Sequence, residues 1–96
     1  MPEIERALRE TIRQRLQNGT LPRVKPSAMW GGPGEERECR ACGLTVTKDQ
    51  MEFEVEFSED PASQVLRTAS VILHFHATCF AAWELERELW LRANRT

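Results

Sequence analysis

The sequence predicts a single small domain of the α+β class, with a helix near each end and an antiparallel β-hairpin between them. Three observations lead to this expectation. Apolar residues recur every four positions in residues 3–17, the stretch "MEFEVEF" (residues 51–57) alternates strictly, and the strand-like run "VILHFH" passes directly into the helix-like run "ATCFAAWELERELW". With 96 residues the chain has a limited core, and small domains of this kind often use a metal ion or a partner subunit as a supplement.

The first expected element is an N-terminal helix within residues 1–19. Its apolar residues form one slowly drifting stripe along the helix. They are Ile4, Leu8, Ile12 and Leu16. Glu5 and Arg9 add an i,i+4 charge pair, and the pair Asn18-Gly19 is a natural C-terminal stop. Because a short helix depends on packing, we expect it to dock on the rest of the chain or on a second copy.

Residues 20–38 are expected to form a linker. They contain three prolines and three glycines and show no periodic pattern. We expect an extended path around Pro22 and Pro26. Trp30 either anchors this linker to the domain surface or lies on a binding face.

The alternating residues 51–57 predict a half-buried strand. Its apolar side chains share one face, and Glu52, Glu54 and Glu56 share the other, which we expect to face water. A turn is expected at residues 58–63, followed by a second strand that ends at His76 and pairs with the first. From Ala77 the pattern becomes helical, with a wide apolar arc that includes Cys79, Trp83 and Leu89.

The third region, residues 39–96, is expected to bind a metal. Cys39-x-x-Cys42 is followed, after 33 residues, by His76-x-x-Cys79 at the junction between strand and helix. Gly43 can adopt the positive φ that a tight turn after the cysteine pair needs, and i,i+3 neighbours in a first helical turn share one face. Four nitrogen and sulfur ligands with no open position are typical of a structural zinc site, and thiolates favour zinc over harder cations. We therefore expect one structural Zn²⁺ at Cys39, Cys42, His76 and Cys79, although the spacing alone does not distinguish zinc from iron.

The order of these segments resembles the treble-clef class of zinc fingers. The zinc knuckle of that class corresponds to "CRACG", and its hairpin corresponds to the alternating strands. The helix that carries the last two ligands corresponds to "HATCFAAW". The Cys-x-x-Cys…His-x-x-Cys pattern is similar to LIM-type fingers and to the fingers of poly(ADP-ribose) polymerases, as well as to small bacterial proteins with a "HxxCxxxW" helix. The resemblance covers roughly residues 39–92 and implies a treble-clef-like fold with the same four ligands. The basic residues that the polymerase fingers use on DNA are not recognisable here.

Three alternatives compete with this assignment. His74 lies on the same strand face as His76, so it could replace His76 as the fourth ligand, orient it, or pack against a glutamate across the hairpin. The cysteines could instead be small buried hydrophobic residues. Cys39 and Cys42 could also form a thioredoxin-like dithiol, but no helix start or βαβ pattern surrounds them.

Charge and composition narrow the function classes. The net charge is −2 and the pI is about 5.7, without the basic footprint of a compact nucleic-acid-binding domain. No membrane-spanning run and no signal-peptide pattern occur, which leads us to expect a cytoplasmic protein. We expect a protein-interaction or regulatory module, binding another protein or itself, and not an enzyme. The alternative is nucleic-acid binding through Arg6, Arg9 and Arg13, which can share one helix face.

Overall fold

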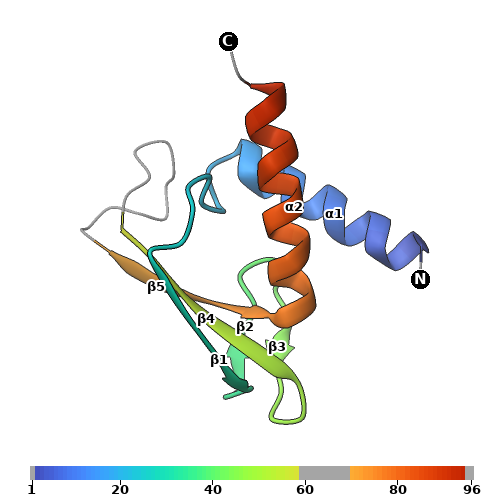
Figure 1. Ribbon diagram of the computed structural model, residues 1–96. Helices are drawn as coiled ribbons and strands as arrows, with labels where there is room; N and C mark the ends of the chain where they lie inside the picture. Colours follow the sequence, from blue (N-terminus) through green and yellow to red (C-terminus); the bar gives the residue numbers. More distant parts are fainter. Residues whose placement is uncertain (1, 59–69, 95–96) are drawn as a thin grey trace.

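Helix α2 packs against a three-stranded antiparallel sheet, and helix α1 packs on α2 (Figure 1). The computed structural model describes residues 2–58 and 70–94, apart from the side chains of residues 2–5. The helices are α1 (Pro2–Gln17) and α2 (Ala77–Ala93). The sheet has the order β1-β4-β5, with β1 (Ala28–Pro33), β4 (Met51–Phe57) and β5 (Val71–His76). A second, two-stranded sheet pairs β2 (Arg37–Glu38) with β3 (Thr45–Val46).

The hairpin of β4 and β5 and the helix that follows it agree with the sequence-based prediction. The two strands are antiparallel with Val55 opposite Leu73, and β5 leads directly into α2. The apolar faces of the strands bury Val55, Phe57 and Phe75 against Trp83 of α2. Apart from Ser58, the expected turn lies outside the described residues, as does the strand-like segment 64–69.

One of the three glutamates of β4 differs from the expected water-facing row. Glu52 is only 2% exposed, whereas Glu54 and Glu56 are half-buried. The chain leaving β1 crosses over this end of the sheet, and the backbone N–H of Glu35 donates to Oε1 of Glu52 at 3.1 Å. The other oxygen, Oε2, lies 2.7 Å from Nδ1 of His74. The carboxylate is therefore buried because its hydrogen-bond partners are supplied by the protein instead of by water.

The segment expected to be a linker, residues 20–38, contains a strand of the sheet. Residues 28–33 form β1, which pairs with β4 so that Gly31 lies opposite Phe53. A Cβ at Gly31 would come within 2.9 Å of the Phe53 ring, so the absence of a side chain lets the ring cover the strand. Pro33, at the end of β1, is tolerated because an edge strand does not need every N–H. The Gly/Pro composition thus marks an edge strand here and not an unstructured connection.

Helix α1 docks on α2 and on the start of the chain segment that follows α1. Ile12 and Leu16 are fully buried in the core, while the expected contributions of the Ile4 and Glu5 side chains lie outside the described residues. Arg23 donates from Nε and Nη2 to the carbonyls of Leu16 and Gln17, both at 2.7 Å, and so satisfies the C-terminal end of α1. The same guanidinium lies 4.4 Å from the centre of the Trp90 ring, which joins the end of α1 to α2.

The buried face of α2 contains two charged residues that its apolar pattern did not indicate. Glu86 is 1% exposed and Arg87 is 5% exposed, whereas Leu89 and Leu91 face the surface. Glu86 accepts hydrogen bonds from Nε of Arg9 and, at 2.8 Å, from Nε of Arg13. Burial alone would raise the pKa of Glu86, but the two arginines outweigh it and leave this pKa below its ordinary value.

We expect Glu86→Ala to lower the free energy of unfolding by about 1.5–3 kcal/mol, because two charge-assisted hydrogen bonds between the helices disappear. Glu10→Ala is the matched control, since its pair with Arg13 joins two exposed side chains and should contribute at most about 1 kcal/mol. The measurement is urea unfolding at pH 7 and at acidic pH. Because the pKa of Glu86 is lowered by folding, its contribution is present at neutral pH and is lost as the pH falls through the lowered value. Equal losses for both variants would contradict this role of Glu86.

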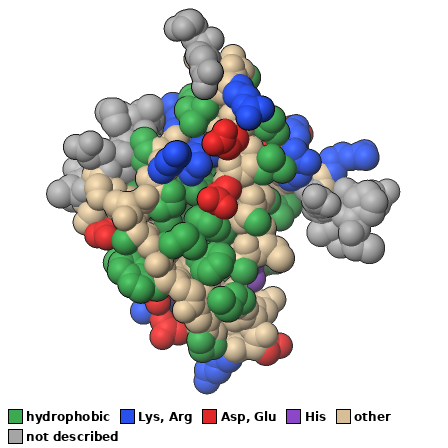
Figure 2. All heavy atoms as spheres, in the orientation of Figure 1, with side chains coloured by type: hydrophobic (Ala, Val, Ile, Leu, Met, Phe, Trp, Pro, Cys, Tyr) green, Lys and Arg blue, Asp and Glu red, His purple; other side chains and the backbone are tan. Residues whose placement is uncertain are grey.

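Several large apolar side chains remain on the surface of the described residues. Figure 2 shows hydrophobic side chains gathered in the middle of the visible face and along its lower left side, with charged side chains mostly above them and at the rim. The most exposed include Leu44 at 68%, Trp30 at 53% and Met51 at 51%. Neither helix in the described part of the chain is long and apolar enough to cross a bilayer.

Candidate metal centre

The first two candidate ligands lie in a tight turn between β2 and β3. Gly43 has a φ of +82°, the left-handed conformation that its position after the cysteine pair predicts. The turn is closed by the N–H of Gly43 donating to the carbonyl of Cys39 and by the N–H of Cys39 donating to the carbonyl of Leu44, both at 2.8 Å. The N–H of Arg40 donates to the carbonyl of His74 at 2.7 Å, which fastens the turn beside β5.

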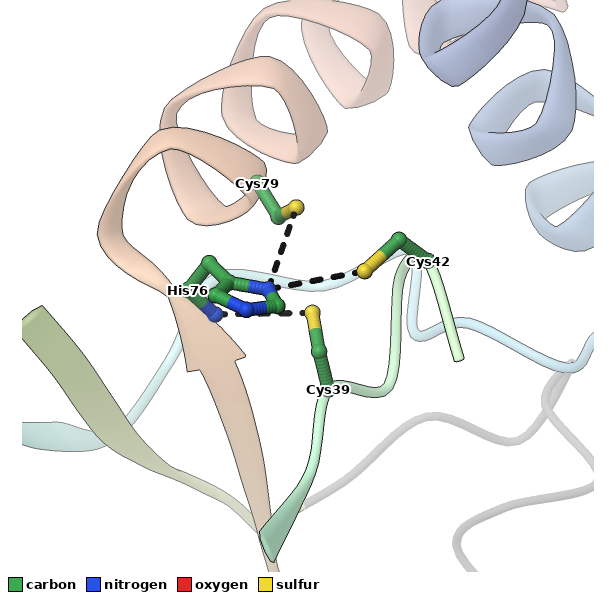
Figure 3. Close-up of side chains that lie close together, drawn as sticks. All are labelled: Cys39, Cys42, His76 and Cys79. Atoms are coloured by element: carbon green, nitrogen blue, oxygen red, sulfur yellow. Dashed lines mark hydrogen bonds between the residues drawn. The ribbon is translucent and has the colours of Figure 1, made fainter. Parts of the chain in front are cut away.

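The other two candidate ligands lie where β5 becomes α2. His76 is the last residue of the strand and Cys79 lies in the first turn of the helix, so both side chains point towards the turn that carries Cys39 and Cys42 (Figure 3). Cys39 and Cys79 are buried, and Cys42 and His76 are half-buried. All three cysteines are free thiols.

The four donor atoms lie close enough to share one ion. All of them are within 4.8 Å of one another. Nδ1 of His76 lies 3.4 Å from Sγ of Cys42 and 3.7 Å from Sγ of Cys79. A tetrahedral zinc ion with bonds of about 2.3 Å to sulfur and about 2.0–2.1 Å to nitrogen places a nitrogen and a sulfur ligand about 3.5 Å apart. The group is therefore compatible with a metal site of the Cys-x-x-Cys…His-x-x-Cys kind.

The three sulfurs differ in acidity because they are so close. A hydrogen bond from the Cys79 thiol, supported by backbone N–H groups, lowers the pKa of Cys39 to about 4 against the opposing effect of burial. The same contact strongly raises the pKa of Cys79, and burial together with the negative charge on Cys39 raises it further. Burial raises the pKa of Cys42, and the charge of Cys39 adds to it. The three sulfurs are thus close enough for the negative charge of one to oppose the ionisation of the others.

Gln50 fixes the orientation of the His76 ring. Its Oε1 atom lies 3.1 Å from Nε2 of His76. An amide oxygen can only accept, so Nε2 carries the proton and the lone pair of Nδ1 is left to point at the sulfurs. Metal-binding histidines commonly hold their second nitrogen in this way. The sequence offered no signal for Gln50, which precedes β4 in a turn.

His74 is not part of the cysteine group. Its side chain contacts Glu52, and together with Glu54 these residues form a separate cluster on the outer face of the sheet. This is the packing against a glutamate across the hairpin that the sequence left as one of three alternatives. His76 is the histidine that the structure brings to the cysteines.

The three arginines considered for nucleic-acid contacts do not form one accessible basic face. Arg9 and Arg13 are both engaged with Glu86, and Arg13 also pairs with Glu10 at 3.3 Å. Arg6 is exposed. The sequence could not show this pairing, because Glu86 is more than 70 positions away along the chain.

A groove of about 400 Å³ borders the cysteine group on the side of α1. Besides three members of the group, its lining includes Ala7, Leu8, Thr11, Leu44, Gln50 and Thr78. This lining contains no carboxylate among the described residues, so no general base for a metal-bound water faces the groove there.

The geometry therefore defines a group of three cysteines and one histidine that is able to hold a metal ion, between the β2–β3 turn and the junction of β5 with α2. Soft sulfur donors favour zinc, and iron is the other ion commonly held by thiolates. Comparison of the chain with protein-family models, with curated proteins and with solved structures found no match.

Proposed function

We propose that this chain binds one Zn²⁺ through Cys39, Cys42, His76 and Cys79, and that the ion is structural. The observation that carries the proposal is that two cysteines in a tight turn and a histidine and cysteine at a helix start bring four donors within 4.8 Å of one another. The ion would join the turn to the hairpin and to α2, which is the arrangement of a treble-clef-like zinc domain.

A structural role is favoured over a catalytic one. Four protein donors leave no open position for water or substrate, which a catalytic zinc ion keeps. The adjoining groove has an apolar lining without a carboxylate among the described residues. We infer that the chain is not an enzyme, and that it acts in a reducing compartment such as the cytoplasm, where thiols stay available to a metal.

We further propose that the domain serves in protein interaction or regulation. Exposed apolar side chains on the sheet edge and on α2 support this role. Apolar surface that is left in water often marks a site where a protein binds a partner. Nucleic-acid binding has less support, since two of the three candidate arginines pair with Glu86.

The test is the metal content of the purified, untagged chain and of two histidine variants. Elemental analysis with native mass spectrometry should find one zinc per chain in the wild type. His76→Ala should lose the ion, because the remaining three sulfurs cannot complete the tetrahedron. His74→Ala should retain it, because that ring contacts Glu52 instead of the sulfurs. Loss of zinc from His74→Ala with retention in His76→Ala would overturn the assignment, as would the absence of any metal from the folded wild type.

A further inference from the structure

Strand β1 leaves one edge of the main sheet open. Within the described part of the chain, β4 lies on one side of β1 and no strand lies on the other. The side chains of β1 are uncharged, and Met29 and Trp30 are 42% and 53% exposed. Edge strands are usually protected by charged side chains or bulges in the middle of the strand. Here Pro33 ends the strand, and its central residues carry no such protection.

The hydrogen-bonding groups that face outward from this edge follow from the register with β4. The N–H of Gly34 donates to the carbonyl of Gln50 at 2.9 Å, so this pair is of the hydrogen-bonded type. Pair types alternate along an antiparallel ladder, which directs the backbone groups of Gly32, Trp30 and Ala28 towards β4. The N–H and C=O groups of Met29 and Gly31 therefore point away from the sheet.

We propose that this edge pairs with β1 of a second copy of the chain, in antiparallel fashion about a twofold axis through Trp30. In this register Met29 of each copy exchanges both backbone hydrogen bonds with Gly31 of the other, giving four bonds. The two Trp30 residues form the central, non-hydrogen-bonded pair, where side chains of neighbouring strands come closest. The two sheets join into one continuous sheet of six strands.

The side chains of β1 favour a second copy in this register. Met29 and Gly31 lie on the inner face, so each methionine would stand opposite a residue without a side chain, beside the Phe53 ring that covers Gly31 of the other copy. Centring the pair on Gly31 would instead place Met29 opposite Pro33, which has no N–H to return. The residue opposite Trp30 on β4 is charged: it is Glu54. The two Glu54 side chains would be three strand spacings apart, about 14 Å, which is beyond the screening length at physiological ionic strength.

This inference rests on the interaction role proposed above, and its test measures self-association and not metal content, so the two can fail separately. Sedimentation equilibrium of the zinc-loaded full chain from about 1 µM to about 1 mM should show a monomer–dimer equilibrium. Trp30→Lys and Trp30→Glu should each weaken dimerisation by about tenfold or more, because like charges then face each other across the pair. An equimolar mixture of the two variants should restore the dimer.

Leu44→Lys is the matched control, since it adds the same charge at an exposed apolar position away from β1 and should dimerise like the wild type. Met29→Pro is a second, independent variant that removes an outward N–H without touching the ladder to β4, and it should also weaken the dimer. A wild type that stays monomeric over the whole range overturns the proposal. So does a dimer that Trp30→Lys and Met29→Pro leave unchanged.

Discussion

Cys39→Ser is expected to release the proposed zinc ion and to unfold residues 39–92, from the cysteine turn to the last turn of α2. Binding of structural zinc by finger peptides contributes on the order of 10 kcal/mol near neutral pH, and the whole stability of a typical domain is only about 5–15 kcal/mol. Cys39 is fully buried, and its sulfur accepts the backbone N–H of His76 at 3.4 Å. The substitution therefore affects both halves of the site at once.

Circular dichroism and tryptophan fluorescence measure this loss of structure, both in Cys39→Ser and in the wild type after its metal is removed by a chelator. Chelated wild-type protein should lose its ordered signal and regain it when zinc is added, whereas Cys39→Ser should not respond to zinc. Leu44→Ser is the control, because it changes an exposed side chain of the same turn and leaves the backbone groups of Leu44 in place. An unchanged spectrum after complete removal of the metal would show that the fold does not depend on the ion.

Trp83→Ala is expected to lower the free energy of unfolding of the zinc-loaded protein by about 3–5 kcal/mol. The indole is fully buried, and its ring centre lies 5.4 Å from that of Phe57 and 5.5 Å from that of Phe80. Its Nε1–H donates to the carbonyl of Pro22 at 3.0 Å. The guanidinium of Arg87 lies 4.7 Å from the ring centre, and its Nε and Nη1 have no hydrogen-bond partner among the described residues. Removing the ring thus leaves a cavity and also takes away the surface that covers Arg87.

Urea unfolding of the metal-loaded variants measures this effect. Leu85→Ala, on the exposed side of the same helix, should cost much less, because its side chain is already 48% exposed. Trp83→Phe should fall between the two, since it keeps an aromatic ring but loses the bond to Pro22. A loss for Trp83→Ala no larger than that for Leu85→Ala would mean that the core is organised around other residues.

The elements that the sequence predicted are those whose pattern is local. The alternation of residues 51–57 and the switch from strand to helix at Ala77 are visible within a few positions, and both are present in the structure. The grouping of the four candidate ligands follows for the same reason. Each pair is only three residues apart, and the hairpin returns the chain to the point where the two pairs meet.

The features that the sequence could not show depend on contacts between distant segments. Gly31 belongs to a strand because residues 28–33 pair with β4, where the Phe53 ring covers this glycine, whereas composition alone suggested a linker. Glu52 is buried because the chain after β1 crosses over it and supplies an N–H. Glu86 interrupts the apolar arc of α2 because Arg9 and Arg13 approach from the first helix. In each case a contact with a residue far away in the sequence decides the structure, and the residues nearby in the sequence do not show it.

The docking of α1 and of the segment around Pro22 has a practical consequence for anyone who shortens the chain. A truncated fragment that begins at Cys39 would keep every donor of the cluster, yet it would lack Ile12 and Leu16 and the carbonyl that holds Trp83. It would also lack β1, so β4 would become an edge strand, unpaired on that side. With the proposed zinc site intact, we expect such a fragment to bind zinc and still to precipitate, so metal binding would be a poor measure of whether the fragment is folded.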